Sequence, residues 1–104
     1  MMTETIQIQI EKVEKSKLEG NEDGELNFGK VFTDHMFIAD FKDGEWGNIK
    51  ITPFADLQLS PATSFIHYGQ SIFEGLKAFH GDDGINRLFR PMENIRRFNK
   101  SAVR

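Results

Sequence analysis

Cysteine is absent from this sequence of 104 residues, which excludes disulfide bonds, thiolate catalysis and cysteine-based metal sites. No apolar run approaches the roughly 18–20 residues that a membrane span requires. The first ten residues contain no basic segment followed by an apolar run, so they do not predict a secretory signal. We therefore expect a cytoplasmic protein that does not enter the membrane.

The chain also lacks a large excess of charge of one sign, since its formal net charge is only −3. This balance lacks the basic signature of a nucleic-acid-binding domain, and we expect no nucleic-acid partner. Residues 84–104 nevertheless carry six basic side chains against Glu93 alone. Such a basic end suits an anionic ligand or an acidic neighbour, although a solvated helix face gives the same pattern.

Phenylalanine, in contrast, is plentiful, with ten copies in a chain that is 38% hydrophobic. A disordered segment would contain fewer aromatic residues, so a folded core is expected. A domain of this size buries only a thin core. We therefore predict that some aromatic side chains face a ligand or a partner.

The first half of the chain carries three strand signals. Residues 5–10 alternate polar and apolar side chains, which predicts a half-buried strand. Residues 35–41 and 48–52 predict two further strands. Turn residues lie at Asp43-Gly44 and again at Gly47, so we expect these two strands to form a hairpin whose loop is longer than two residues.

The second half adds another hairpin. Residues 65–74 are aromatic without clean periodicity, and they predict an irregular segment or a short helical turn. Strands are expected at 76–80 and 85–90, around a turn formed by residues 81–84.

A helix is predicted to begin at Pro91, because proline is tolerated at the first helical position. Ile95, Phe98 and Ala102 fall on one face of this helix. The helical pattern runs to the last residue without a capping glycine or a proline, so we expect the chain to be cut short at Arg104. The predicted fold class is α+β, with antiparallel strands and hairpins followed by a C-terminal helix.

The sequence contains no self-sufficient active site. It has no phosphate-binding P-loop and no glycine-rich dinucleotide motif, and its three histidines are too widely spaced for a metal site. Asp82 and Asp83 are interpreted as turn formers because glycines flank them. We interpret Lys77 as an ordinary exposed strand residue. No metal ion and no catalytic residue are expected within this chain.

Three blocks of the sequence resemble branched-chain amino acid aminotransferases, the pyridoxal-phosphate (PLP) enzymes of class IV. The blocks are FGKVFTDHM at residues 28–36, HYGQSIFEGLKAF at 67–79, and the segment 87–104, which begins RLFRP. Their order and spacing match the family. The resemblance implies that residues 28–104 are part of the smaller N-terminal domain of a fold-type IV aminotransferase, truncated at Arg104. Residues 1–27 are then an N-terminal extension with one possible strand.

The resemblance also implies an activity and a cofactor. Members of the family reversibly transfer an amino group between L-leucine, L-isoleucine or L-valine and 2-oxoglutarate, using PLP held between two domains. Arg97 matches the arginine that binds the cofactor phosphate, and a guanidinium suits a phosphate because it offers a bidentate fork and a permanent charge. The family's Schiff-base lysine lies beyond Arg104. Lys77 does not match it, and the chain alone is expected to be inactive.

Three aromatic residues match family positions that line the pocket for the aliphatic substrate side chain. They are Phe28, Tyr68 and Phe73. Aromatic rings give a branched side chain apolar surface and give a polar one no partner, so desolvation supplies selectivity. The tyrosine at the Tyr68 position reaches the pocket of the other subunit in the family. A homo-oligomer, at least a dimer, is therefore expected for the full-length protein.

Two alternatives stay open at this point. The first is a related class IV PLP enzyme, a D-amino acid aminotransferase or an aminodeoxychorismate lyase. The second is a stand-alone, non-catalytic binding module that takes a phosphorylated ligand or pairs with a full-length subunit.

Overall fold

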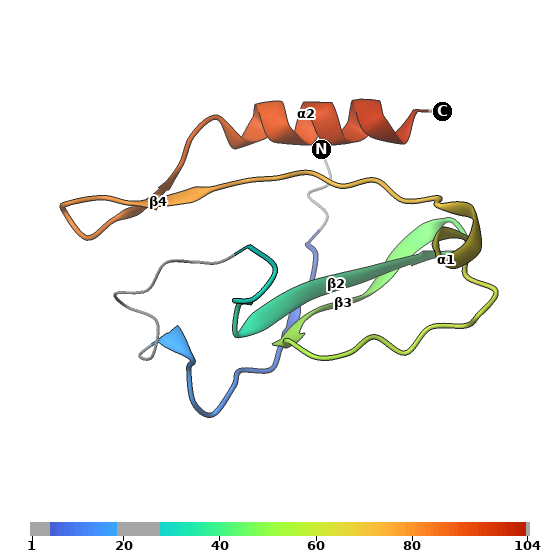
Figure 1. Ribbon diagram of the computed structural model, residues 1–104, viewed down its shortest axis with the longest axis horizontal. Coiled ribbons are helices and arrows are strands. Elements are labelled where there is room, and N and C mark those ends of the chain that lie inside the picture. Colours follow the sequence, from blue (N-terminus) through green and yellow to red (C-terminus); the bar gives the residue numbers. More distant parts are fainter. Residues whose placement is uncertain (1–4, 19–27, 104) are drawn as a thin grey trace. The chain divides into compact units, whose positions relative to one another are not determined.

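The computed structural model describes residues 5–18 and 28–103. The chain divides into two compact units, residues 1–57 and residues 58–104, which we call the first and second unit. Figure 1 shows the chain from its N-terminal region in blue to its C-terminal helix in red. The observed mixture of sheet, hairpin and C-terminal helix confirms the predicted α+β class.

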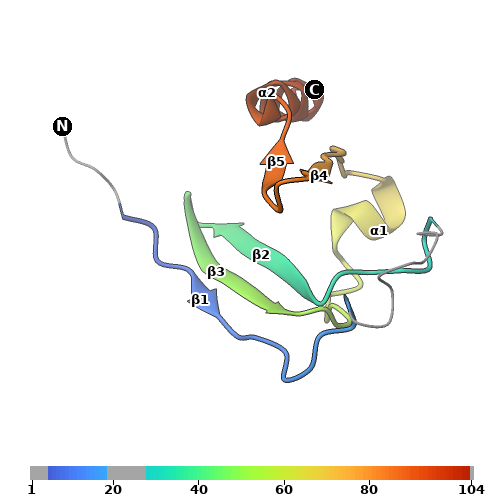
Figure 2. The same cartoon turned by 90° about the vertical axis from the view of Figure 1, so that its left-hand side faces the viewer.

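The first unit is built on a three-stranded sheet in the order β1-β3-β2, seen in Figure 2. Its strands are β1 (Gln9–Ile10), β2 (His35–Lys42) and β3 (Glu45–Pro53). β2 and β3 pair antiparallel along nearly their whole length, whereas β1 pairs parallel to β3. Both strands of the predicted hairpin are therefore present, and each is longer than the alternation in the sequence indicated.

The hairpin loop is shorter than we expected. Lys42 pairs with Glu45, so only Asp43 and Gly44 connect the strands. Both have positive φ, 53° and 83°, which is the requirement of a two-residue loop that follows the twist of the strands. The prediction of a longer loop was wrong, because Gly47 lies within β3 and not in the turn.

A β-bulge in β3 explains why Gly47 lies within the strand. The register shifts between Ile38 and Asp40 of β2, opposite the stretch that contains Gly47 and Asn48. Asn48 adopts φ 50°, and its side-chain Nδ2 donates a hydrogen bond to Asp40 Oδ2 at 2.9 Å. Asparagine tolerates this left-handed conformation better than most residues, so the extra residue is accommodated within the strand.

Hydrogen bonds attach the N-terminal segment to this sheet, including one from the Val13 backbone to His35 Nε2 at 3.0 Å. β1 covers only two residues of the predicted strand 5–10, and the backbone of Glu11 donates a hydrogen bond to the carbonyl oxygen of Ile51 at 2.9 Å. Further along, Asp34 accepts hydrogen bonds from the Ser16 hydroxyl at 2.6 Å and from the Lys17 backbone at 2.9 Å. These hydrogen bonds lower the pKa of Asp34, so the ionised carboxylate holds the segment.

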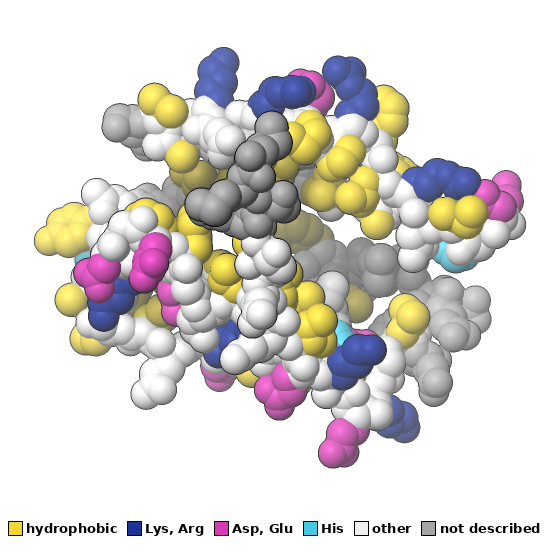
Figure 3. Space-filling view, turned by 180° about the vertical axis from the view of Figure 1, so that it is seen from behind, with side chains coloured by type: hydrophobic (Ala, Val, Ile, Leu, Met, Phe, Trp, Pro, Cys, Tyr) yellow, Lys and Arg dark blue, Asp and Glu magenta, His cyan; other side chains and the backbone are white. Residues whose placement is uncertain are grey.

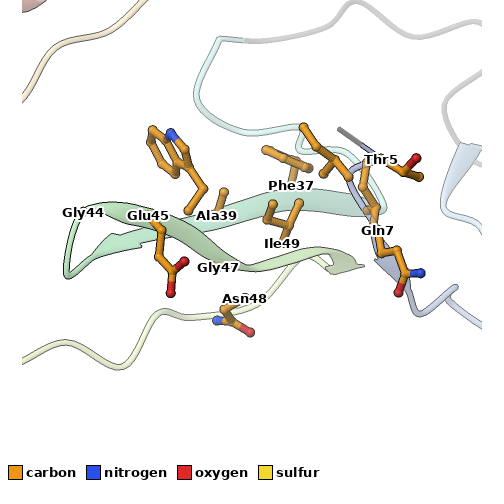
Figure 4. Close-up of a pocket in the computed structure, with 12 residues that line it drawn as sticks. Thr5, Gln7, Phe37, Ala39, Gly44, Glu45, Gly47, Asn48 and Ile49 are labelled. Carbon is orange, nitrogen blue, oxygen red and sulfur yellow. The ribbon is translucent and has the colours of Figure 1, made fainter. Parts of the chain in front are cut away.

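An open hollow of about 980 Å³ lies beside the sheet, within the first unit. Figure 4 shows Phe37, Ala39 and Ile49 on one face of the β2–β3 hairpin, with Thr5 and Gln7 from the N-terminal segment nearby. Glu45 is the one titratable side chain among the described residues that line it. The hollow therefore offers apolar surface without a set of groups for acid–base chemistry.

Every described side chain is at least partly accessible to solvent. The structure has no buried residue among those described, and Figure 3 shows hydrophobic side chains at the surface. Two aromatic pairs in the first unit give partial shelter: Phe32 stacks on Phe54 at 4.9 Å, and Phe41 meets Trp46 edge-on at 5.1 Å. The core is therefore even smaller than the sequence predicted, and apolar side chains remain exposed to solvent in both units.

The second unit contains two helices and one hairpin. Its elements are α1 (Ser64–Tyr68), β4 (Ala78–His80), β5 (Asn86–Leu88) and α2 (Pro91–Ala102). The short α1 confirms the helical turn expected within residues 65–74. The predicted hairpin is also confirmed, although each strand is shorter than predicted.

The turn between β4 and β5 is built around an aspartate. Asp83 Oδ1 accepts a hydrogen bond from the Ile85 backbone at 3.1 Å, and its carboxylate pairs with Arg87 at 2.5 Å. The hydrogen bond from Arg87 lowers the pKa of Asp83. This geometry confirms the interpretation of Asp83 as a turn former.

Gly81 is packed against this turn, and we expect Gly81→Ala to destabilise the second unit. A Cβ atom there would lie 2.5 Å from Arg87 Nη1, 2.6 Å from Asp83 Oδ1 and 3.1 Å from the Ile85 carbonyl oxygen. The Asp83–Arg87 pair would have to move, at a cost of about 1 kcal/mol. Urea unfolding of the full-length protein measures this loss. Gly47→Ala, which meets open space, is the control, and an equal effect of both substitutions would contradict the prediction.

Helix α2 begins at Pro91, as predicted, and ends at Ala102, short of the chain end to which the predicted helix ran. The more buried face of α2 also differs from the predicted face. Pro91, Asn94 and Phe98 are half-buried, whereas Ile95 is 45% exposed. At twelve residues, α2 is the longest helix of the described part, and none there is long and apolar enough to cross a membrane.

Candidate functional site

In the second unit, an ion pair joins α2 to the segment before β4. Arg97 Nε donates a hydrogen bond to Glu74 Oε2 at 2.8 Å, and Arg97 Nη2 donates to Glu74 Oε1. Two parallel N–H···O bonds of this kind make a forked ion pair, the strongest arrangement available to an arginine and a carboxylate.

Asn94 completes the contact from the same helix. Its Nδ2 atom donates to Glu74 Oε1 at 3.1 Å and to the Gly75 carbonyl oxygen at 2.8 Å. Asn94 and Arg97 are three residues apart on α2, so their side chains lie on one face of the helix. We call Glu74, Asn94 and Arg97 the acid–arginine cluster.

Burial in this cluster is unequal. The side chain of Glu74 is 12% exposed, and that of Arg97 is 68% exposed. The hydrogen bond from Arg97 lowers the pKa of Glu74 from 4.5 to about 2, and the same bond raises the pKa of Arg97. Both side chains are therefore charged at neutral pH, with the carboxylate sheltered and the guanidinium turned partly toward solvent.

Arg97 retains donors that the cluster does not use. A guanidinium carries five N–H groups, and the fork to Glu74 engages one on Nε and one on Nη2. Both N–H groups of Nη1 have no hydrogen-bond partner among the described residues. An exposed, permanently charged edge with free donors can bind an anion while the Glu74 pair stays in place.

The other described arginines of this basic end have different partners. Arg96 pairs with Glu93 on the solvent side of α2, and Arg90 lies 3.8 Å from the same carboxylate. Arg87 is held by Asp83 in the β4–β5 turn. For these three residues the solvated surface indicated by the charge pattern is the better interpretation. Among the arginines that the structure describes, Arg97 alone joins two separate segments through a sheltered acid.

The three predicted pocket residues are all exposed. Phe28 lies in a turn of the first unit and is fully exposed, Tyr68 is the last residue of α1 and 81% exposed, and Phe73 is 89% exposed. None of their rings stacks on another aromatic ring among the described residues. A role in the core is therefore excluded for them within their own units.

The structure brings one predicted residue, Arg97, into a cluster, and places Phe73 next in sequence to its partner Glu74. Tyr68 lies in the same unit but makes no hydrogen bond to the described residues of that cluster, and Phe28 belongs to the first unit. Lys77 is exposed, as expected, although it precedes β4 rather than lying in it. The described residues contain no group of three or more histidine and acidic side chains that would hold a metal.

Sequence reasoning missed Glu74 and Asn94. A weak signal for them existed, because Asn94 lies on the same helix face as Arg97 and Glu74 is the only acid between Asp56 and Asp82. An acid embedded in an apolar stretch needs a cationic partner, and Arg97 is that partner.

Comparison with known proteins supports one family. No model of a known protein family matches the chain. Individual curated proteins do match, however. Over 80 residues the chain is 51% identical to branched-chain-amino-acid transaminase 1 of Bacillus subtilis, an alignment that covers 76% of the chain and 22% of that protein. Branched-chain-amino-acid aminotransferase 2 of the same organism is 42% identical over 105 residues, which cover 100% of the chain and 28% of that protein.

A mammalian relative shows a similar identity. The mitochondrial branched-chain-amino-acid aminotransferase of Bos taurus is 42% identical over 98 residues, covering 93% of the chain and 25% of that protein. The chain thus spans about a quarter of the length of the curated relatives it matches, and it aligns with their N-terminal part. By these identities the chain belongs to the branched-chain-amino-acid aminotransferase family.

Proposed function

We propose that the natural gene product carrying this sequence transfers the amino group of L-leucine, L-isoleucine or L-valine reversibly to 2-oxoglutarate. The observation that carries the proposal is the 42–51% identity to three proteins named as branched-chain-amino-acid transaminases or aminotransferases, two from one bacterium and one from a mammal. Residues 28–104 would then be part of the smaller N-terminal domain, with residues 1–27 as an extension.

The proposed cofactor is PLP, which when bound supplies an electron sink for negative charge on the amino acid substrate. Arg97 is the residue of this chain that fits the cofactor. Its side chain is 68% exposed, and its Nη1 donors have no partner among the described residues, as a phosphate site requires. Its role would be to bind and neutralise the phosphate, which holds the cofactor in place during the reaction. The chemistry at the amino group would belong to a lysine outside residues 1–104.

Phe28, Tyr68 and Phe73 would supply part of the wall against which the aliphatic substrate side chain packs. The support is their exposure, since all three rings are more than four-fifths accessible in the structure. Aromatic surface that is not used inside its own unit is available to a ligand or to another subunit. A homodimer in which Tyr68 serves the partner's pocket, located in the cytoplasm, is part of the same proposal.

A substrate panel on the full-length gene product tests this function. We expect amino transfer to 2-oxoglutarate from L-leucine, L-isoleucine and L-valine, and little from D-alanine. Preference for D-alanine would identify a D-amino acid aminotransferase, and pyruvate release from aminodeoxychorismate would identify the lyase. A gene product that retains no PLP and reacts with none of these compounds would favour a non-catalytic binding module.

A further inference from the structure

We propose that Glu74 is a positioning residue for Arg97, holding its guanidinium so that the free Nη1 edge stays available to the cofactor phosphate. The inference rests on the proposed function, because it takes Arg97 as the phosphate ligand. It assigns to Glu74 a task that neither the family resemblance nor the comparisons give it. Glu74 itself does not touch the cofactor in this proposal.

The first support is the geometry of the fork. Glu74 engages Nε and Nη2, the two nitrogens along one edge of the planar guanidinium, which leaves Nη1 away from that edge. A forked pair fixes both the position and the plane of the arginine head group, whereas a single hydrogen bond would allow rotation. An arginine on a helix surface otherwise loses much rotamer freedom when it binds a ligand, and the fork removes that freedom beforehand.

The second support is that Glu74 is itself held in place. Asn94 donates to Glu74 Oε1 at 3.1 Å and, with the same nitrogen, to the Gly75 carbonyl oxygen at 2.8 Å. The carboxylate therefore has partners on α2 and is tied through Asn94 to its own neighbouring backbone. A side chain that is 12% exposed and bonded in this way is a fixed support for the more exposed Arg97.

Charge alone would predict the opposite effect, which makes the proposal testable. An ionised acid beside the cation reduces its attraction for a phosphate, so removal of the acid would tighten binding if electrostatics dominated. Because Arg97 lowers the pKa of Glu74 from 4.5 to about 2, the ion pair is complete above about pH 4.5 and is lost as the pH falls toward 2. At every working pH, the orientation of Arg97 by Glu74 therefore competes with the repulsion between Glu74 and the phosphate. Whether a substitution of Glu74 weakens or tightens PLP binding decides between the two effects.

The experiment measures the Kd of PLP for the full-length apoenzyme at neutral pH, by titration of cofactor absorbance. We expect Glu74→Ala to raise this Kd about 5–10-fold, a coupling typical of residues in direct contact. Glu74→Gln retains one acceptor oxygen for the guanidinium and should raise the Kd less. Glu93→Ala, which removes the acid paired with the neighbouring Arg96, is the matched control and should leave the Kd unchanged.

Two further measurements separate positioning from a structural role. In the Arg97→Ala background, Glu74→Ala should have no further effect on the Kd, because Glu74 would act only through Arg97. Pyridoxal, which lacks the phosphate, should bind wild type and Glu74→Ala equally. Loss of pyridoxal binding to the same extent would mean general damage and would overturn the proposal. If Glu74→Ala does not fold, the intermediate Kd expected of Glu74→Gln is the test.

Three other outcomes would contradict the proposal. Tighter PLP binding by Glu74→Ala and Glu74→Gln would show that repulsion dominates and that Glu74 does not position Arg97. An unchanged Kd in Glu74→Ala, together with a weakened one in Arg97→Ala, would overturn the role of Glu74 and leave the phosphate role of Arg97 intact. An unchanged Kd in Arg97→Ala would remove the phosphate role of Arg97 and with it the basis of this proposal.

Discussion

Replacing Arg97 with alanine in the full-length gene product should raise the Kd of PLP by about 10–100-fold, because a hydrogen-bonded charge of this kind typically contributes about 1.5–3 kcal/mol. The exposed Nη1 edge of Arg97 would contribute directly to the phosphate, and no other arginine of the described residues would replace it. Equilibrium titration of the apoenzyme measures the change. Arg97→Lys should recover only part of the affinity, because lysine keeps the charge and loses the fork.

The adjacent Arg96 is a closely matched control for this prediction. Its side chain is 66% exposed against 68% for Arg97, and it also forms an ion pair with a glutamate. Arg96→Ala should therefore change net charge and helix surface in the same way without affecting the Kd of PLP. Equal losses from both substitutions would mean that general basic charge attracts the cofactor, and that Arg97 has no specific role.

Phe73→Ala should lower kcat/KM for L-leucine by about 10–100-fold, the range expected when an apolar contact of one side chain is removed from a substrate pocket. The same change should leave the unfolding midpoint in urea nearly unaltered, because the ring of Phe73 is 89% exposed within its own unit. Steady-state kinetics with L-leucine, L-valine and 2-oxoglutarate, together with urea unfolding, would measure both effects.

Phe89 serves as the comparison, since it is another exposed phenylalanine of the second unit, at 74%. Phe89→Ala should not alter the preference among branched-chain substrates. A large drop in stability of Phe73→Ala, or undiminished activity toward L-leucine, would place Phe73 outside the substrate pocket.

Local signals in the sequence predicted most of the elements. Pro91 marked the start of α2, and the glycine-flanked acids marked the β4–β5 turn, because both effects act within a few residues. The length of the first hairpin loop was predicted wrongly because that prediction also relied on a local signal alone. Gly47 resembles a turn residue in isolation, and only its pairing with Asp40 across the sheet shows that it belongs to a strand.

The candidate site was predicted in part. Arg97 was identified through the resemblance, but its partners were not, since Glu74 and Arg97 are 23 residues apart and no local pattern connects them. The face of α2 was also shifted, because Asn94 turns inward to satisfy the Gly75 carbonyl and Glu74 while Ile95 turns outward. Contacts of this kind depend on tertiary packing, which overrides simple hydrophobic periodicity.

The parallel pairing of β1 with β3 affects how the first unit assembles. β2 and β3 are neighbours in the chain and close through a two-residue loop, so their hairpin is expected to form within microseconds. β1 meets β3 across about forty residues of chain and contributes a two-residue strand, so we expect it to dock late and to detach first. Whenever β1 lifts away, the free edge of β3 presents unpaired N–H and C=O groups to any strand nearby. At Lys50 and Ile51 the short N-terminal strand thus occupies the edge of β3 that another strand could otherwise pair with, and the hydrogen bonds to the ionised Asp34 help to hold that segment in place.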